Sequence, residues 1–453
     1  MTSARHWLWR AVPGTPAERS AAVWSFAYFF MLLAGYYVLR PLRDQMGIAG
    51  GVKALPWMFT ATFVTLLAAQ PLYGQLVAKV PRRRFIPIVY HFFAANLVLF
   101  WLLLSLNVEP VAVARVFFVW VSVFNLFAVT VFWSFMADLF TSEQGKRLFG
   151  FIGAGGTAGA LLGPSITIAL SVPLGPANLL MVAAVLLEVA VYCVYRLERT
   201  TGPAQQEAVG EQRIGGSAWA GVAAVLRSPY LLGVAGWVSL LSFGATILYF
   251  AQANLVSSGV QGAGAQTRVF ASVDLAVGVL TLATQIIVTG PLLKRFGTAF
   301  AAGALPAVYV AGFAVLALVP TLTVVLVFQV VQRWANFAIA NPARQLFFTV
   351  VNRDEKYKAK NLIDVVVYRG SDAQYGWLFE SLQALGLKLA AIAVCALPVS
   401  IAWIALSAAL GRTQERRAAL TPSGPSAEFK HLDDARSLGQ AAGAGTRGDS
   451  KAR

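Results

Sequence analysis

The sequence predicts an all-α polytopic membrane protein of about twelve transmembrane helices, arranged as two six-helix bundles. Of its 453 residues, 58% are hydrophobic and only 12% are charged. Soluble domains carry about 25% charged residues, so this chain has too little polar surface to cover itself in water. Long apolar stretches alternate with short basic clusters, which is the pattern of a chain that crosses a membrane repeatedly.

Twelve stretches are long and apolar enough to cross a bilayer, which takes about twenty residues in a helix. They are 21–40, 54–79, 85–106, 111–139, 148–171, 177–198, 229–252, 268–293, 298–319, 321–350, 361–384 and 388–411. A β-barrel would instead show strands of about ten residues with alternating polarity. The runs are too long and too continuous for that fold.

The basic residues predict the orientation. With both termini in the cytoplasm, 27 of the 36 Lys and Arg residues fall in cytoplasmic loops or tails, six fall at the opposite face and three lie within spans. The positive-inside rule favours this arrangement, and we expect the bacterial inner membrane as the location. The net charge of +16 gathers at the edges of apolar runs, so we do not expect nucleic acid as a partner.

The polar segments divide the chain into five parts. These are a cytoplasmic tail (1–20), a first six-helix bundle (21–198), a cytoplasmic linker (199–228), a second six-helix bundle (229–411) and a tail (412–453) rich in Gly, Ser, Ala and charge. Such a composition predicts disorder in the last part.

The two halves carry matching landmarks. Lys79 and Lys294, Asn125 and Asn336, and Glu143 and Glu355 are separated by 215, 211 and 212 positions. Near-constant offsets indicate a duplicated six-helix unit, the usual origin of carriers that work by alternating access. The basic turns after the second and eighth spans also resemble the cytoplasmic loops of the major facilitator superfamily.

Three stretches resemble the non-mitochondrial ATP/ADP translocases and their relatives in free-living bacteria. They are Tyr-Tyr-Val-Leu-Arg-Pro-Leu-Arg-Asp at 36–44, Phe-Trp-Ser-Phe-Met-Ala-Asp at 132–138, and 342–370 from Pro-Ala-Arg to Tyr-Arg-Gly. The resemblance covers both halves. It implies a major-facilitator fold and an antiporter that exchanges nucleotides of the ATP/ADP type. In one respect the chain departs from that family, which depends on lysines and glutamates in its spans, because the cations within the spans here are arginines.

The tenth span carries a polar stripe. Gln329, Arg333 and Asn336 stand at i, i+4 and i+7 and share one helical face, with Arg344 further along. A charge at mid-bilayer costs roughly 2.5–3.5 kcal/mol, so it faces a cavity or a partner. The stripe is interpreted as a binding surface for an anionic solute, since guanidinium suits carboxylate and phosphate. The alternative is interhelical hydrogen bonding that fixes packing.

Acidic residues occur in the eleventh and eighth spans. Asp364, Tyr368 and Asp372 stand at i, i+4 and i+8, with Arg369 beside them, and Asp274 lies in the eighth span. Each acid is a candidate for carrying a proton in coupling. Asp364 and Asp372 are equally candidates for pairing with Arg333, Arg344 or Arg369, whereas the alternative for Asp274 is an isolated, hydrated acid near a span end, close to Arg268.

In the first half, Arg40, Arg43 and Asp44 are expected to follow the first helix, which Pro41 helps to end. They are candidates for a gate or for the rim of the site. The alternative is a set of side chains that extend to the membrane surface.

The fourth span offers Asn125 as a candidate for the opposite wall of the site, with Trp120 and Trp133 as less favoured candidates. At the cytoplasmic end of this span, Asp138 is expected to form a gate with the charged cluster at 354–358.

The remaining signals exclude an enzyme. Gly155, Gly159 and Gly163 are spaced for close helix packing, and no strand precedes them as a dinucleotide site requires. There is no Walker A sequence, catalytic triad or metal-ligand cluster, so neither cofactor nor metal is expected. We expect a monomer that binds a small anionic molecule within the lipid bilayer. Two alternatives stay open: a proton-coupled carrier of another solute, and a non-transporting scaffold with an occluded centre.

Overall fold

The computed structural model describes residues 15–79, 82–200, 218–287, 289–351, 359–360 and 362–420, and all regular structure in these ranges is helical. A helical segment occupies each of the twelve predicted spans. The predicted all-α polytopic fold is therefore confirmed.

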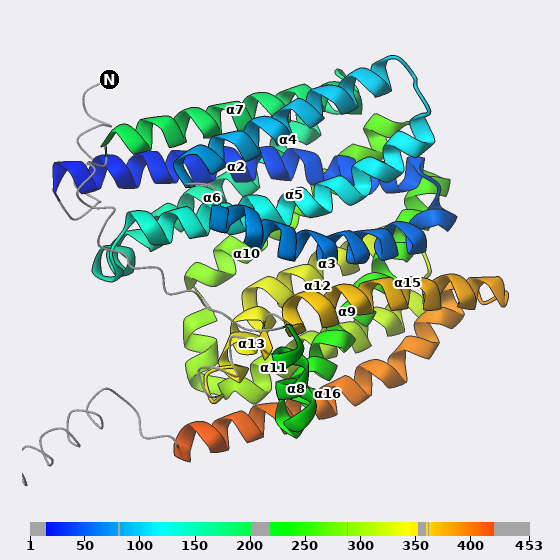
Figure 1. Cartoon of the computed structure of the whole chain (residues 1–453). Helices are drawn as coiled ribbons and strands as arrows, with labels where there is room; N and C mark the ends of the chain where they lie inside the picture. The colour runs from blue at the N-terminus through cyan, green and yellow to red at the C-terminus, as the bar shows by residue number, and fades with distance from the viewer. Residues whose placement is uncertain are drawn as a thin grey trace, which may run out of the picture.

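The first bundle consists of six helices around an aromatic core (Figure 1). They are α2 (Pro16–Ala49), α3 (Leu55–Lys79), α4 (Arg82–Ser105), α5 (Pro110–Leu139), α6 (Ser142–Leu170) and α7 (Pro176–Thr200). Tyr28, Phe117, Phe124 and Phe132 are almost fully buried in its centre.

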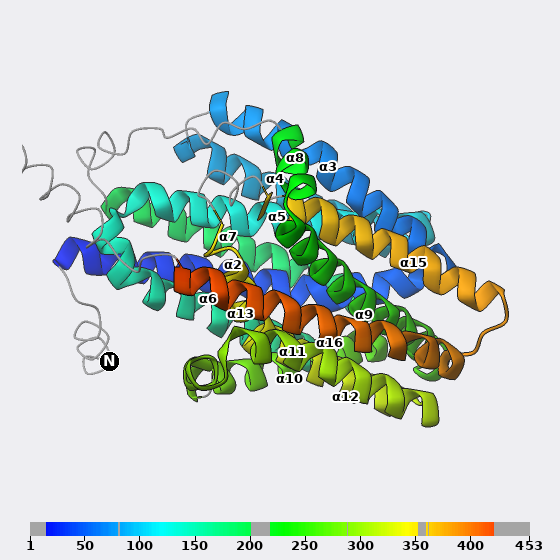
Figure 2. The ribbon, with the colours of Figure 1, turned by 90° about the horizontal axis from the view of Figure 1, so that it is seen from below.

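The second bundle follows a short helix, α8 (Ala218–Arg227). Its segments are α9 (Pro229–Gly259), α10 (Ala263–Ile287), α11 (Thr289–Leu318), α12 (Leu322–Ala335), η3 (Asn336–Ala340), α13 (Asn341–Phe347), η4 (Leu362–Val367), α15 (Tyr368–Ala384) and α16 (Leu389–Leu420). Trp237, Tyr309 and Trp403 form the centre of its core. In Figures 1 and 2, α11 and α16 lie side by side on the side away from the first bundle.

In the described part of the chain, eleven helices are long and apolar enough to cross a membrane. The eleventh predicted span, 361–384, is not among them. It consists of η4, a π-helical turn, and α15, which has 17 residues and carries Arg369 and Asp372. Its polarity fits a helix that faces the other bundle rather than lipid.

Two helix ends differ from the predicted ones. A capping box between Thr15 and Glu18 starts α2 at Pro16, inside the predicted tail. At the other end of the chain, α16 continues to Leu420 rather than stopping at 411. Gln414 is buried there, and the Glu415 carboxylate accepts hydrogen bonds from the backbone N–H groups of Thr298 and Ala299, which holds the extension against α11.

The prediction that the first helix ends at Pro41 is wrong. Pro41 lies inside α2, which continues to Ala49, so Arg40, Arg43 and Asp44 are helical residues within the bundle. Proline removes one backbone hydrogen bond but does not prevent the helix from resuming when neighbouring helices hold it. Arg40 and Arg43 therefore project from the helix body and do not form a rim beyond it.

The glycines of α6 lie against α2. A Cβ atom at Gly159 would stand 2.3 Å from the Phe30 carbonyl oxygen, and one at Gly163 would stand 2.6 Å from the Ala34 carbonyl oxygen. Only glycine allows this approach, which is the packing role predicted from their spacing.

The bundles touch at the end of the molecule opposite α2's first residue. The rings of Trp57 and Trp377 pack edge to face with centroids 4.8 Å apart, and the Trp377 indole N–H donates to Thr60 Oγ1 at 3.0 Å. Near the same end, Gly264 of α10 lies against the carbonyl of Ser171, just after α6. Figure 1 shows the helices of the two bundles converging at this end and diverging toward the end where α2 begins and α16 finishes.

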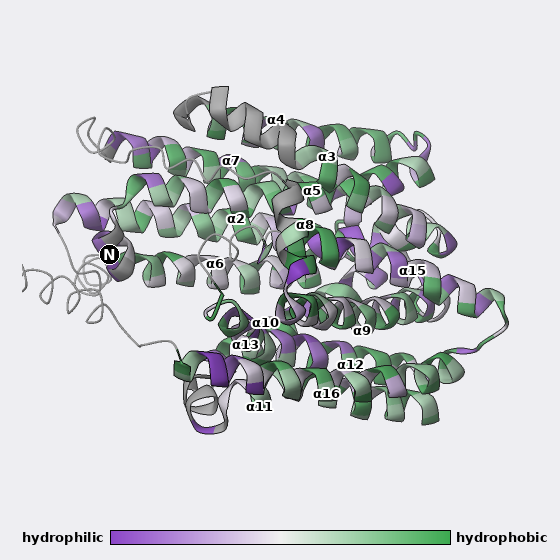
Figure 3. Ribbon diagram, turned by 60° about the horizontal axis from the view of Figure 1, so that its bottom comes forward, coloured by the Kyte–Doolittle hydropathy of each residue, from purple (hydrophilic) through white to green (hydrophobic). Residues whose placement is uncertain are grey.

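Side-chain polarity follows the same geometry. Figure 3 shows hydrophobic residues over the outer faces, while hydrophilic residues gather at helix ends and where the bundles face one another. This distribution suits a molecule surrounded by lipid, with its polar groups inside.

Candidate functional site

A cavity lies between the two bundles and has two adjoining parts. The outer part has a volume of about 290 Å³ and is lined from both bundles, with Asn125, Arg344 and Asp364 among its walls. The inner part, of about 200 Å³, reaches Arg40, Arg43 and related groups. The two parts share Leu241, Asn336, Phe337, Tyr368 and Arg369 in their walls, so they adjoin one another.

Three charged side chains meet across the inner part. Arg333 Nη2 donates to Asp274 Oδ1 at 2.6 Å, and Arg40 Nη1 lies 3.5 Å from the same oxygen. Arg40 belongs to α2, whereas Asp274 and Arg333 belong to α10 and α12, so this cluster joins the bundles. The expectation that Asp274 is an isolated acid beside Arg268 is thus replaced by a pairing with two arginines.

Arg43 and Asp44 form the second group. Arg43 Nη1 donates to Asp44 Oδ1 at 3.1 Å, and its Nε donates to Ser122 Oγ at 3.0 Å. The guanidinium also lies over the Phe118 ring, 4.0 Å from the centroid, which holds it in place from α5. Asp44 accepts a further hydrogen bond from the Tyr249 hydroxyl of α9 at 3.2 Å, a second polar link between the bundles.

Asp372 is the centre of the third group. It is 6% exposed and accepts from Ser242 Oγ at 2.5 Å, from Thr246 Oγ1 at 3.4 Å and from Arg369 Nη1 at 3.3 Å. These donors satisfy a buried carboxylate, as its position inside the bundle requires.

The fourth group lies in the outer part of the cavity. Arg344 Nη1 and Asp364 Oδ1 are 3.5 Å apart, a contact too long to be a good hydrogen bond. The two π-helical turns, η3 and η4, contribute Asn336 and Asp364 to this wall. Such turns are frequent at functional sites because they rotate the side chains that follow.

Taken together, the four groups have almost equal numbers of positive and negative formal charges. Five guanidinium groups (Arg40, Arg43, Arg333, Arg344, Arg369) face four carboxylates (Asp44, Asp274, Asp364, Asp372), which leaves one positive charge. Within the described ranges, no three His, Cys, Asp or Glu side chains are grouped to hold a metal ion. The chemistry of the cavity is therefore that of guanidinium, carboxylate and amide groups.

The predicted stripe of the tenth span has two roles. Gln329 and Gln332 are buried in a chain of hydrogen bonds, in which the Tyr309 hydroxyl donates to Gln332 Oε1 at 2.8 Å and Gln332 Nε2 donates to Gln329 Oε1 at 2.8 Å. All three of Gln329, Arg333 and Asn336 also line the inner part of the cavity. Both of the predicted roles, packing and lining, occur on one helix.

Among the other predicted site residues, Asn125, Tyr368 and Arg369 line the cavity, whereas Asp138 lies near the end of α5 and lines neither part. Its expected partners, 354–358, lie outside the described residues. Trp120 is packed among Phe93, Phe117 and Phe124, and Trp133 is packed against Phe29, Phe132 and Phe149, so the tryptophans support the first bundle.

Three residues of α9 that donate hydrogen bonds to the site were not predicted. Ser242, Thr246 and Tyr249 supply hydroxyl groups to Asp372 and Asp44. Their spacing of three and four residues places them on one face of α9. That spacing is the signal that could have identified them within an otherwise apolar span.

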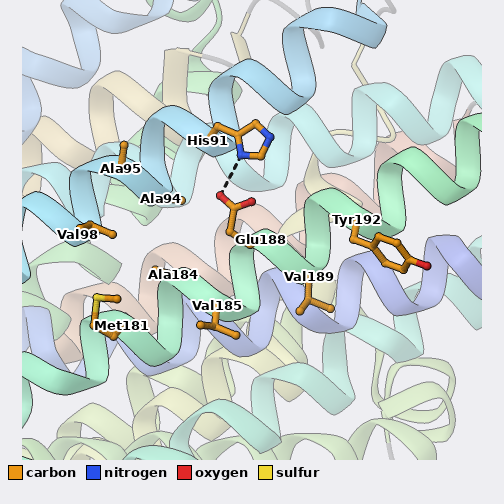
Figure 4. Close-up of a pocket in the computed structure, with 10 residues that line it drawn as sticks. All are labelled: His91, Ala94, Ala95, Val98, Met181, Ala184, Val185, Glu188, Val189 and Tyr192. Atoms are coloured by element: carbon orange, nitrogen blue, oxygen red, sulfur yellow. Dashed lines mark hydrogen bonds and ion pairs between the residues drawn. The ribbon is translucent and has the colours of Figure 1, made fainter.

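A larger hollow, of about 590 Å³, lies on the outer side of the first bundle between α4 and α7. Figure 4 shows it lined by alanines and valines, with the His91 Nδ1 hydrogen-bonded to Glu188 Oε1 at 2.9 Å. It shares no residue with the central cavity, and its walls are almost entirely apolar. The central cavity, although smaller, holds the charged groups and is the candidate site.

The fold and the site together define a polytopic membrane protein with a polar cavity between two six-helix bundles, which is an architecture of secondary transporters. The sequence pattern of the Major Facilitator Superfamily matches residues 9–355, and the chain belongs to this superfamily of transporters. A comparison with curated protein sequences finds no match.

Solved structures of similar fold include three transporters. A bacterial homolog of the human lysosomal transporter Spinster, in an inward-facing and unoccupied conformation, is 14% identical with a TM-score of 0.55, over 91% of this chain and 100% of that one. A bacterial homologue of the iron transporter ferroportin, in an inward-facing state, is 12% identical with a TM-score of 0.62, over 88% and 98%. A point variant of the nucleoside transporter NupG is 13% identical with a TM-score of 0.51, over 88% and 99%.

Proposed function

We propose that this protein is a secondary active transporter that exchanges organic anions, with nucleotides of the ATP/ADP type or related phosphorylated anions as the leading candidates. The observation that carries the proposal is the cavity between the bundles, which is lined by five arginines and three aspartates, with the buried Asp274 paired to two of these arginines. A guanidinium group binds phosphate or carboxylate through two parallel hydrogen bonds, which lysine does not offer.

The walls of the cavity also suit the part of such a solute that is not phosphate. Asn125, Asn336 and Asn341 line the outer part of the cavity, and their amides both donate and accept hydrogen bonds. Tyr368 adds an aromatic ring beside Arg369. The resemblance of three sequence stretches to the ATP/ADP translocases supports nucleotides, and the fold shared with a nucleoside transporter is compatible with them.

The closed end of the cavity supports alternating access. The Trp57–Trp377 contact joins the two bundles at the end opposite the start of α2, and in an alternating-access carrier it would close that end. With both termini in the cytoplasm, as the basic residues predict, this is the inward-facing conformation. The solute would then enter or leave on the cytoplasmic side.

A proton-coupled carrier is the second candidate. Asp372 and Asp44 are buried carboxylates that reach the cavity and accept hydrogen bonds from hydroxyl groups, so either is placed to take up a proton. A non-transporting scaffold would also have its buried charges paired. It would not need polar cavities lined from both bundles, and for that reason we favour transport.

The first experiment is a thermal-shift screen of the purified full-length protein against nucleotides, sugar phosphates and carboxylates. The proposal predicts stabilisation by one or more phosphorylated anions, because a ligand that binds only the folded state raises the melting temperature. Stabilisation by uncharged solutes alone would contradict it.

A further inference from the structure

The surplus positive charge of the cavity has a definite location. Arg40 and Arg333 share one oxygen of Asp274, so one carboxylate serves two guanidinium groups. The other pairs are one to one: Arg43 with Asp44, Arg369 with Asp372, and Arg344 with Asp364. The unbalanced charge therefore lies on Arg40 and Arg333.

Arg333 has unused hydrogen-bonding capacity, because its Nε is a buried N–H donor without an acceptor. Both arginine side chains still reach the cavity, with 22% of Arg40 and 15% of Arg333 exposed, whereas Asp274 is only 2% exposed. A buried donor without an acceptor destabilises its site, so an anionic group between the two arginines would satisfy the charge of both and the free donor of Arg333.

We propose that the transported anion binds between Arg40 and Arg333 with one net negative charge, and that Asp274 sets this charge. The inference rests on the proposed function, anion transport through this cavity, and narrows the class of solute. Since Arg40 comes from the first bundle and Arg333 from the second, the anion also joins the bundles at the point where they must move together.

Electrostatics explains the preference. Alternating access passes through a closed state that contains little water, and there an uncompensated charge is far more costly than in solution. One negative charge makes the loaded cluster neutral. A phosphate monoester carries about 1.5 to 2 negative charges at pH 7, so it would bind in its singly ionised form or together with a cation. Nucleotides of the ATP/ADP type carry several negative charges, so they would bind here only together with a cation, and among the candidates of the proposed function the inference favours singly charged phosphorylated anions.

Two small probes test the inference without depending on the rest of the solute. Methyl phosphate carries nearly two charges at pH 7.5, and dimethyl phosphate carries one, while their sizes differ by a single methyl group. Binding is measured by titrating each probe against the melting temperature of the purified full-length protein. The wild type should bind dimethyl phosphate more tightly, by on the order of tenfold.

Charge-changing variants then give four distinct expectations. Arg40→Gln leaves a balanced Arg333–Asp274 pair and should weaken both probes by about tenfold or more. Asp274→Asn adds a positive charge and should shift the preference to methyl phosphate. The double variant Arg40→Gln/Asp274→Asn again has one unpaired guanidinium, and dimethyl phosphate binding should return. Arg268→Gln removes an exposed charge from α10 and should leave the preference unchanged.

The double variant is decisive because a purely structural role predicts the opposite result. If Arg40 and Asp274 only held the bundles together, removing both would weaken binding further than removing Arg40 alone. Should Asp274→Asn misfold, Arg40→Gln and the double variant still give the comparison. If phosphorylated anions are transported but probe binding ignores charge, the inference fails while the proposed function stands. If anions of any charge neither bind nor move, both fail.

Discussion

Arg40 and Arg333, which come from opposite bundles, meet on the same carboxylate oxygen of Asp274, at 3.5 and 2.6 Å. Both guanidinium groups also line the cavity, where 22% of the Arg40 side chain and 15% of the Arg333 side chain are exposed. The anion site proposed between them depends on this position, and so does the first prediction.

Replacement of Arg333 by alanine should reduce solute uptake to background while most of the protein still folds, since Arg40 then remains paired one to one with Asp274. Arg333→Lys should restore only part of the activity, because an ammonium keeps the charge but not the two parallel hydrogen bonds. Uptake into proteoliposomes and size-exclusion profiles measure the two properties. A misfolded alanine variant whose folded fraction transports normally would assign Arg333 to packing.

The positions of the membrane spans were predicted well from the sequence, whereas the partners of the charged side chains within them were predicted poorly. The length of the apolar stretches identified even the eleventh span, 361–384, which is more polar than the others. The partners of Asp274 were not predictable, because helical periodicity gives the face of each helix but not which faces meet once two bundles dock. The π-helical turn at Asn336–Ala340 adds to this difficulty, since it shifts the register between Arg333 and Arg344 within one span.

The predicted end of the first helix was wrong for a different reason. Pro41 predicts a stop from local backbone chemistry. In the structure, tertiary packing overrides that preference, and Leu39, Leu42 and Met46 continue the buried face of α2 on both sides of the proline.

The closed end of the molecule should lock transport when it is cross-linked. In a background with Cys193 and Cys395 replaced by alanine, Trp57→Cys/Trp377→Cys should react with a short bifunctional thiol reagent, because the native rings are 4.8 Å apart. Transport should fall after cross-linking and recover after reduction, since alternating access requires this end to open. Each single-cysteine variant serves as the control. Full activity in the cross-linked protein would refute the gating role of this contact.

Orientation is open to a direct check. Reporter fusions after Arg199 and after Leu420 should both read cytoplasmic, since most basic residues fall on that side. The fusion site at Leu420 follows the last described residue of α16 and leaves the helix intact. A periplasmic reading at one site would contradict the twelve-span topology, and a periplasmic reading at both would invert the assignment of the closed end.

The outer hollow between α4 and α7 should affect stability rather than transport. Glu188→Ala removes the hydrogen bond to His91 within a membrane-facing groove, and interhelical bonds of this kind contribute about 0.6 kcal/mol on average. The melting temperature should fall slightly, with an unchanged KM for uptake. His91→Phe/Glu188→Leu should recover the stability by filling the groove with apolar side chains. A large change of KM in either variant would place this hollow in the transport path.

Exchange of labelled solute in proteoliposomes tests the central claim most directly. Vesicles containing the purified protein are loaded with an unlabelled phosphorylated anion that binds in the thermal-shift screen, and uptake of the labelled anion is followed from outside. An exchanger should take up label much faster into loaded than into empty vesicles, should respond little to an imposed pH gradient, and should lose the effect in Arg333→Ala. Uptake that follows the pH gradient, ignores the internal solute and fails in Asp44→Asn or Asp372→Asn would contradict anion exchange and establish the proton-coupled carrier in its place.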